Sequence, residues 1–397
     1  MNKDKIQIYQ FATNPVCSPY RFDFPREQLN RRGNVQVTKF TKLDAAVYAE
    51  LVEYADMLII QRLPMSPRLA QVCSALNSRG KLIIFEIDDD LLHLRPESRY
   101  AKQAPPDYRQ RIEQSLLASQ AVQCSTQALA NVISQIHPEV VVLENQFDKL
   151  FPYNSRKKDG GIIIGYAAGE DHFLDWLTIK DAYNTTIVQL ELEGFQVESW
   201  IIGDKAIFES IASKNKRYFP LLQRSEYLQL LQQVDISLIP LADIPFNRSK
   251  SDVKFLESAG CGAAVLASKF VYSNSVKNGE TGILFSNADE FANGLTELVR
   301  SQELTERLSR NAQRYVSENR LIEQHVEKWE DTYLSWVSNR DKLLRNIRKS
   351  IVNVILGRAR NLFMAPSQPK HCLCKYASKS SESEKFLQYS STRGCIN

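Results

Sequence analysis

The chain has 397 residues, which is enough for about two domains that each bury a core. A hydrophobic content of 43% and a charged content of 24% are ordinary for a globular protein and argue against disordered and fibrous classes. The net charge of +4 is unevenly distributed along the chain. The tail from Arg340 onward holds 12 basic and 3 acidic residues and has a net charge of +9. The body before it holds 38 basic and 43 acidic residues and has a net charge of −5. The body therefore offers no basic face for nucleic acid.

No apolar run approaches the ~20 residues of a membrane span. The N-terminal segment also lacks the long apolar stretch of a secretory signal. Seven scattered cysteines favour reduced thiols. We therefore expect a cytoplasmic protein.

Short apolar runs alternate with helical patterns along the first half, which is typical of a mostly parallel sheet. We expect strands at Ile6–Tyr9, Val35–Thr38, Met57–Gln61, Leu82–Ile87, Ala121–Cys124 and Val140–Leu143. Helical patterns between them include Leu43–Tyr54 and Pro67–Asn77.

A polar, turn-rich stretch at 152–161 marks the expected domain boundary. The second half then repeats the alternation of strands and helices. We expect its strands at Gly161–Tyr166, Val197–Ile202, Val234–Pro240, Ala264–Ala267 and Gly282–Phe285. From 288 to 336 the pattern is helical.

The stretch 236–268 predicts a buried strand, a polar loop, a helix and a second strand. Four residues are placed where the helix begins: Arg248, Ser249, Lys250 and Ser251. Free backbone N–H groups and the helix dipole favour a phosphate at such a point. Glu257 follows on the same helix, where its carboxylate could accept hydrogen bonds from ribose hydroxyls. This pattern indicates a nucleotide-sugar site.

Residues 245–257, PFNRSKSDVKFLE, resemble the donor-binding motif of family 4-like (group 1) glycosyltransferases. The resemblance implies an α/β GT-B fold, in which two Rossmann-like domains with parallel sheets face each other across a cleft. It implies a nucleoside-diphosphate sugar donor, no cofactor and no obligatory metal. The acceptor would be a glycan, a lipid-linked saccharide or a protein, in cell-envelope polysaccharide assembly.

The same resemblance implies a domain plan. Residues 1–152 would form the acceptor-side domain and 161–320 the nucleotide-sugar-binding domain. A helix at 321–340 would return to brace the first domain.

In the motif, Lys250 and Lys254 are the strongest candidates for neutralising the diphosphate leaving group. An ordinary salt bridge from Lys254 to Glu257, one turn later, is a serious alternative. Asn247 would orient a hydroxyl or merely shape the turn. Arg248 would bind phosphate or be solvated.

The segment 165–172, GYAAGEDH, resembles the GSPTH-type loop of the family, and its final residue, His172, matches. Gly165 and Gly169 would let the backbone approach a ligand closely. A helix N-terminus with acidic residues complementing the dipole explains the same pattern equally well.

The run EIDDD at 86–90 ends an apolar strand, and ligands bind beyond the carboxyl ends of such strands. We favour acceptor binding by Asp88 and Asp89, or a loop role, over a metal site. His93, or Asp89 nearby, is a candidate for contact with the reacting sugars. Arg21, after the first strand, is a candidate acceptor contact or a surface residue beside Asp23.

Two departures from the family leave alternatives open. Many members have a first glutamate where Ser249 stands, and an Arg and Lys pair after the first strand of the second domain is also missing. The phosphate-binding role would then fall to Arg248 and Lys250. The alternatives are a non-catalytic nucleotide-sugar or glycan-binding module and a GT-B sugar-nucleotide epimerase.

The tail has its own pattern. Residues 341–365 predict a basic amphipathic helix that would lie on an anionic membrane surface, on the body of the protein or on a partner helix. Residues 366–397 are rich in Ser and Lys and are expected to be disordered.

Overall fold

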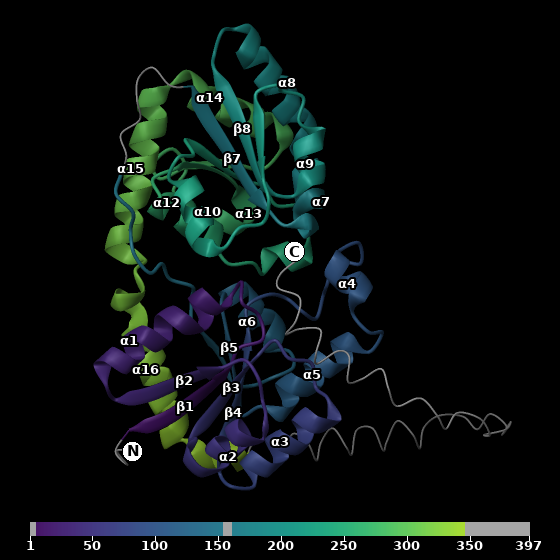
Figure 1. Cartoon of the computed structure of the whole chain (residues 1–397), viewed down its shortest axis with the longest axis vertical. Coiled ribbons are helices and arrows are strands. Elements are labelled where there is room, and N and C mark those ends of the chain that lie inside the picture. Colours follow the sequence, from purple (N-terminus) through teal and green to yellow (C-terminus); the bar gives the residue numbers. More distant parts are fainter. Residues whose placement is uncertain (1–4, 154–160, 346–397) are drawn as a thin grey trace, which may run out of the picture.

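The computed structural model describes residues 5–153 and 161–345. Its strands form two six-stranded sheets, which lie one above the other in Figure 1. The first sheet has the order β2 (Val35–Phe40), β1 (Ile6–Phe11), β3 (Met57–Gln61), β4 (Leu82–Ile87), β5 (Ala121–Cys124) and β6 (Val140–Val142). The second has the order β12 (Ile283–Phe285), β11 (Ala264–Ser268), β10 (Ile236–Ile239), β7 (Ile162–Ala168), β8 (Val197–Gly203) and β9 (Lys216–Phe219).

Every strand pair is parallel. Each expected strand is present to within two residues at either end, and β9 is an additional strand. The strand order reverses between β1 and β3 in the first sheet and between β7 and β10 in the second. In open parallel sheets, ligands bind beyond the carboxyl ends of the strands at such reversals.

Helices connect the strands and cover both sheets. In the first half they are η1 (Pro19–Asp23, one π turn), α1 (Phe24–Arg32), α2 (Ala45–Tyr54), α3 (Pro67–Asn77), α4 (Arg99–Gln103), α5 (Tyr108–Ala118) and α6 (Gln127–Ile133). In the second half they are η2 (Glu170–His172), α7 (Phe173–Leu177), α8 (Lys180–Leu192), α9 (Lys205–Ser210), α10 (Arg224–Leu231), α11 (Pro245–Arg248), α12 (Val253–Gly260), α13 (Lys269–Tyr272), α14 (Ala288–Arg300), α15 (Gln302–Asn319) and α16 (Ile322–Ser338).

Local sequence explains several of these boundaries. The side chains of Asp44, Ser66 and Thr126 accept hydrogen bonds from backbone N–H groups in the first turns of α2, α3 and α6. The strands β3 and β4 are buried along their whole length, which is why their sequences are mostly apolar, apart from the buried Gln61 and Glu86.

The helix α16 returns from the second sheet to the first, as Figure 1 shows on the left of the molecule. Its buried Trp329, Tyr333 and Trp336 pack into the core that also holds Val35 and Met57 of the first sheet. Each of the two domains is Rossmann-like, and together they form a GT-B fold, as the sequence predicts.

A buried ion pair lies at the centre of the first domain. Arg21 and Glu86 have fully buried side chains, and Arg21 Nε lies 2.6 Å from Glu86 Oε1. Arg21 also donates to Asn145 Oδ1 at 3.0 Å, and its guanidinium lies 5.2 Å from the Trp329 ring. Burial raises the pKa of Glu86, and Arg21 opposes that rise. Arg21 is therefore a core residue, which corrects its predicted contact with an acceptor.

The tail begins in this domain as well. Residues 340–345 are helical, and Leu343 is buried in the first core with Leu344 against it. The remainder of the predicted amphipathic helix and the predicted disordered segment lie outside the described residues. Within 5–153 and 161–345, no helix is long and apolar enough to cross a membrane.

Replacing Arg21 by Met should lower the free energy of unfolding by roughly 3–5 kcal/mol, because the Glu86 carboxylate would be left buried without its cation. Urea denaturation followed by tryptophan fluorescence measures this loss. Arg109→Met is the matched control, since Arg109 is exposed and pairs with Glu113 on the surface of α5. A variant as stable as the wild type would contradict the core role and return Arg21 to the acceptor-contact hypothesis.

Candidate active site

The largest group of predicted site residues lines one cleft between the two sheets, with a volume of about 540 Å³. The turn after β1 supplies Cys17 and Tyr20, and the end of β4 supplies Asp88 and Asp89. The second domain contributes residues that follow β7, β9 and β10, and residues of α12. They are Gly169, His172, Arg224, Tyr227, Lys250, Ser251, Lys254 and Glu257. The cleft thus lies beside the strand reversals of both sheets.

The predicted donor motif folds differently from the single helix that we expected. A short helix, α11, ends at Arg248, and α12 begins only at Val253. Lys250 and Ser251 lie in the turn between them and line the cleft. Lys254 and Glu257 follow on the cleft-facing side of α12.

Arg248 and Ser249 do not line this cleft. The Arg248 side chain is 64% exposed and pairs with Asp243 at 2.6 Å in its own loop. Ser249 is buried, and its carbonyl accepts a hydrogen bond from Thr126 of the first domain at 2.9 Å. Both placements correct the predicted donor contacts, since neither side chain is available to a phosphate in the cleft.

Asn247 and Gly165 also have structural roles. The buried Asn247 amide donates to Asp175 Oδ1 and to the carbonyl of Ala242, both at 2.8 Å. A Cβ atom at Gly165 would lie 2.7 Å from the side chain of Val234, so this glycine allows close packing rather than ligand approach. A Cβ at Gly169 would meet nothing within 4 Å, and Gly169 lines the cleft.

Glu257 receives hydrogen bonds from tyrosines of both domains. Tyr20 donates to Glu257 Oε1 at 2.6 Å, and Tyr227 to Oε2 at 3.2 Å. Arg224 Nε in turn donates to the Tyr20 hydroxyl at 3.1 Å, while its Nη2 lies 2.7 Å from Asp148. Burial and the Glu257 charge raise the pKa of Tyr20, so its hydroxyl stays protonated and donates.

The two lysines differ in their surroundings. Lys254 Nζ donates to the carbonyl of Ala167 at 2.9 Å. Burial lowers its pKa, and Glu257 opposes the change. Lys250 Nζ lies 3.8 Å from Asp89 Oδ1, across the gap between the domains.

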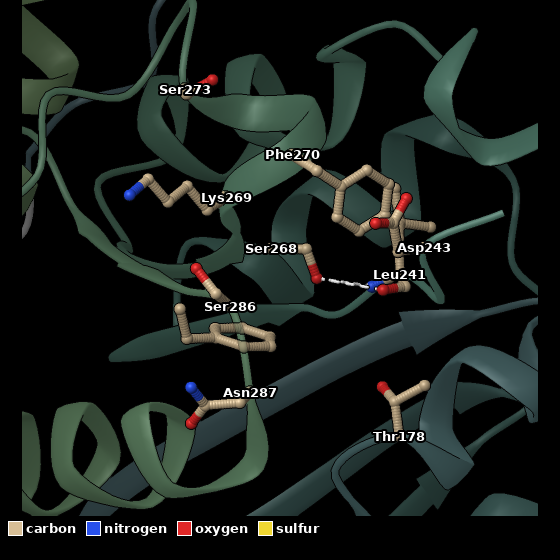
Figure 2. Close-up of a pocket in the computed structure, with 10 residues that line it drawn as sticks. Thr178, Leu241, Asp243, Ser268, Lys269, Phe270, Ser273, Ser286 and Asn287 are labelled. Carbon is tan, nitrogen blue, oxygen red and sulfur yellow. Dashed lines mark hydrogen bonds between the residues drawn. The ribbon is translucent and has the colours of Figure 1, made fainter. Parts of the chain in front are cut away.

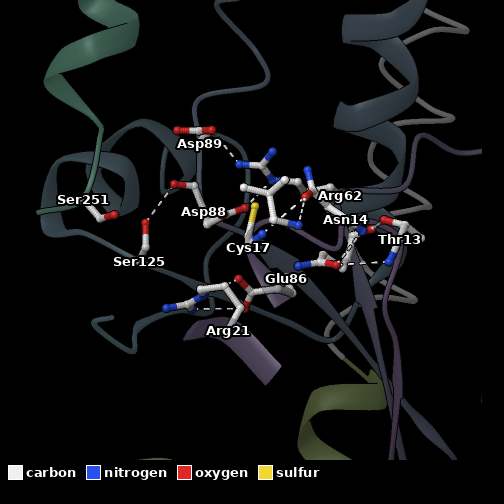
Figure 3. Close-up of polar contacts among 12 residues, drawn as sticks. Thr13, Asn14, Cys17, Arg21, Arg62, Glu86, Asp88, Asp89, Ser125 and Ser251 are labelled. Atoms are coloured by element: carbon white, nitrogen blue, oxygen red, sulfur yellow. Dashed lines mark hydrogen bonds and ion pairs between the residues drawn. The ribbon is translucent and has the colours of Figure 1, made fainter. Parts of the chain in front are cut away.

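Arg62 organises the carboxylates at the end of β4. It pairs with Asp88 through Nε, and its Nη2 lies 2.6 Å from Asp89 Oδ2; Figure 3 shows both carboxylates beside it. Burial opposes the charged form of Asp89, yet Lys250 and Arg62 lower its pKa to about 2. Among the described residues other than glycine, Arg62 alone has a positive φ, of 50°, a conformation that costs energy outside glycine.

His93 and His172 differ in their position relative to the cleft. His93 is 44% exposed, does not line the cleft, and its Nδ1 lies 2.9 Å from Asp90 Oδ2, so its predicted contact with the reacting sugars finds no support in the geometry. His172 does line the cleft, and its Nδ1 lies 2.8 Å from Asp175 Oδ2. Burial lowers the pKa of His172, Lys250 and Lys254 add to this effect, and Asp175 opposes it.

Sequence reasoning missed Tyr20, Arg62, Asp175 and Arg224. Asp175 carried a signal, because it follows His172 by three residues at the start of a helix. Arg62 and Arg224 carried none, since their partners are distant in sequence. Within the described residues, no group of three or more His, Cys, Asp and Glu side chains is placed to hold a metal ion.

A second cavity, of about 550 Å³, lies beyond Leu241 at the carboxyl ends of β11 and β12. Figure 2 shows that serine hydroxyls, Lys269 and Asn287 surround it. The Ser268 hydroxyl is bonded to the backbone of Leu241, and Asn287 caps α14. The polar groups of this cavity that make hydrogen bonds, Ser268 and Asn287, therefore have structural roles.

The comparisons with known proteins agree with this architecture. A family model described as glycosyl transferase-like matches residues 188–331, from α8 to α16. No curated protein matches the chain.

Several solved structures share the fold. HepE from Anabaena, in complex with UDP and glucose, superposes with a TM-score of 0.56 at 17% identity, over 83% of this chain and 99% of that one. Sucrose-phosphate synthase from Thermosynechococcus elongatus gives 0.59 at 12% identity, over 84% and 100%. The pneumococcal O-GlcNAc transferase GtfA, in complex with UDP and GlcNAc, gives 0.51 at 15% identity, over 77% and 61%.

These matches confirm the GT-B fold that the resemblance implies. The chain has the GT-B fold of known glycosyltransferases along most of its length.

Replacing Asp89 by Asn should flatten the acid limb of the stability curve. The folded-state pKa of about 2 lies below the ordinary value of 3.8, so the charged form stabilises the fold above pH ~4, and this contribution is lost as the pH falls toward 2. The variant should lose on the order of 2 kcal/mol at pH 6 and show a shallower decline between pH 4 and 2. Urea titrations across this range measure it, with the exposed Asp181→Asn as control. Parallel curves for wild type and D89N would contradict the assignment.

Proposed function

We propose that the chain is a glycosyltransferase that moves a sugar from a nucleoside-diphosphate sugar to a glycan, a lipid-linked saccharide or a protein. The observation that carries this proposal is the convergence of Lys250, Lys254 and Glu257 in one interdomain cleft of a GT-B fold. Two cations and one carboxylate at a strand reversal match the needs of a diphosphate and a ribose.

The donor diphosphate would lie between Lys250 and Lys254, near the start of α12 and the turn at Gly169. The Asp252 side chain makes no capping bond to α12, since it pairs with Arg320 instead. The first N–H groups of α12 are then available to a phosphate oxygen. When the glycosidic bond breaks, these groups stabilise the charge that develops on the leaving diphosphate.

Glu257 would bind the ribose hydroxyls. Its carboxylate already accepts hydrogen bonds from Tyr20 and Tyr227, so a ribose would share or replace these donors. The base would then lie toward Leu221 and Gln223, the cleft-lining residues that follow β9.

The reacting sugar would lie near Asp89 and His172, which line the cleft from opposite domains. Asp89 is charged at neutral pH and His172 is neutral, because burial and the two lysines lower the pKa of the imidazole. Each side chain can then accept a hydrogen bond from a sugar hydroxyl. In this proposal the two lysines do the work that a metal ion does in other sugar-nucleotide enzymes.

We further propose a family 4-like, hexosyltransferase-type enzyme of cell-envelope polysaccharide assembly, working in the cytoplasm or at the membrane surface. HepE in complex with UDP and glucose, and GtfA in complex with UDP and GlcNAc, make UDP-sugars the first donors to test. The burial of Leu343 at the start of the tail favours docking on the protein body over membrane contact for that part.

The donor site is tested by calorimetric titration with UDP-, GDP-, TDP- and ADP-sugars. One class of sugar nucleotide should bind. At a free concentration of about 100 times its dissociation constant, that sugar nucleotide should raise the free energy of unfolding by ~2.7 kcal/mol. Glu257→Gln and Lys254→Met should each weaken binding roughly 10- to 100-fold, the effect of losing a charged hydrogen bond.

Arg248→Met is the matched control, because this arginine belongs to the same motif but points to solvent. It should bind the donor like the wild type. Acceptor-dependent release of the nucleoside diphosphate then completes the test. Binding without turnover would indicate a non-catalytic module, and conversion of the donor without an acceptor would indicate an epimerase.

A further inference from the structure

Asp175, at the start of α7, is a buried carboxylate that accepts hydrogen bonds from four other residues. Its side chain is 0% exposed. It accepts hydrogen bonds from His172 Nδ1 at 2.8 Å, from the Ala242 backbone N–H at 2.9 Å and from Asn247 Nδ2 at 2.8 Å. Arg95 supplies two more, from Nη2 at 2.7 Å and Nη1 at 3.3 Å. The carboxylate is therefore held in one orientation.

This arrangement fixes the tautomer of His172. Burial opposes the charged form of Asp175, but its bond from His172 and its other donors lower the pKa of the carboxyl to about 2. A charged carboxylate only accepts hydrogen bonds, so His172 Nδ1 must carry the proton. Nε2 is then the ring nitrogen with a free lone pair, on a residue that lines the cleft.

Arg95 reaches Asp175 from the other domain. It lies in the stretch between β4 and α4, and its side chain is 6% exposed. Its Nη1 also donates to the carbonyl of Asp171 at 3.2 Å, and the backbone N–H of Arg99 donates to Asp171 Oδ1 at 2.8 Å. Figure 1 shows α4 of the first domain next to α7 of the second. Residues 95–99 thus dock on the turn that carries His172.

We infer that Arg95 and Asp175 form an interdomain relay that sets the state of His172, so that its Nε2 accepts a hydrogen bond from a substrate sugar hydroxyl only while the two domains are apposed. Arg95 and Asp175 are positioning residues in this relay, and His172 is the group that meets the substrate. The inference rests on the proposed function for the identity of the hydroxyl, and on the contacts alone for the relay.

The physical basis is charge balance around a buried carboxylate. With Arg95 docked, Asp175 has a permanent cation, and the imidazole can stay neutral. If the domains separate, Asp175 loses that cation, and His172 gains a proton to replace it. Nε2 then changes from acceptor to donor.

Other charged groups act on this balance. Lys250 and Lys254 oppose protonation of the imidazole. Asp89 and Asp204 favour it, since each interacts electrostatically with His172. Lys250, Lys254 and Asp89 line the cleft and Asp204 caps α9, and none of these placements depends on Arg95. A change at Arg95 can therefore be isolated by mutation.

The relay is tested by NMR of the protein with ¹⁵N-labelled histidine rings, without substrate. The chain has five histidines, and His172→Gln identifies the signal of interest. In the wild type at pH 7.5 the His172 ring should carry its proton on Nδ1. Arg95→Met should raise the titration midpoint of His172 by roughly one unit, the usual effect of removing a neighbouring cation. Arg95→Lys keeps the positive charge, so the titration midpoint of His172 in this variant should lie close to the wild-type value.

Arg109→Met, on the surface of α5, should leave the His172 signal unchanged. Wild-type protein with the proton on Nε2, or an Arg95→Met variant whose His172 titrates like the wild type, would overturn the relay. The measurement of the proton position on the wild-type ring does not require any variant to fold.

Kinetics then connect the relay to the reaction. Arg95→Met should lower kcat at least tenfold with a smaller change in donor KM, and Arg95→Lys should recover part of it. Because the NMR measurement needs no substrate, an inactive protein with the expected His172 signal would count against the proposed function alone. An active protein whose kcat is insensitive to Arg95 would count against the relay alone.

Discussion

The buried ion pair between Arg21 and Glu86 holds the two segments that shape the first-domain side of the cleft. Arg21 follows Tyr20 directly, and Glu86 lies two residues before Asp88, so the core pair and the cleft residues share the same backbone. Gln123 of β5 donates to Glu86 and accepts from Tyr333 of α16. The returning helix, the sheet and the cleft are thereby connected through one charged contact. Because both of its side chains are fully buried, protein groups must satisfy their hydrogen bonds.

Cleft electrostatics depend on a second constraint, the packing of like charges at the end of β4. Asp88 and Asp89 would repel each other without Arg62, and Arg62 adopts its left-handed backbone where it can reach both. Strain of this kind persists only where neighbouring contacts over-determine it. Asp89 stays charged and can then attract Lys250 from the opposite domain.

Sequence patterns predicted the fold well because parallel strands buried on both faces leave nearly continuous apolar runs, as in β3 and β4. The strand β9 was missed because KRYF is a short edge strand with charged residues, which has no such run.

In the site, Lys250, Lys254 and Glu257 were predicted because a local motif holds them together, and the structure places all three in the cleft. Arg21 and Arg248 were misplaced for a physical reason. Arg248 pairs with Asp243, five residues away in an exposed loop, and nothing in the motif distinguishes such a pair from a phosphate contact. Glu86, the buried partner of Arg21, is 65 residues away in sequence. The partners Tyr20 and Arg95 were missed for the same reason, since their contacts cross between domains.

Three of the residues proposed to meet the donor, Lys250, Glu257 and His172, are engaged by the first domain or by partners that reach it. Lys250 meets Asp89, Glu257 meets Tyr20, and His172 is linked through Asp175 to Arg95. A ligand that takes over any of these contacts changes the free energy that holds the domains together, and by linkage the apposition of the domains changes the affinity for that ligand. Donor binding and domain movement are then one equilibrium. The residues that determine the position of this equilibrium lie in the first domain as well as in the donor motif of the second domain.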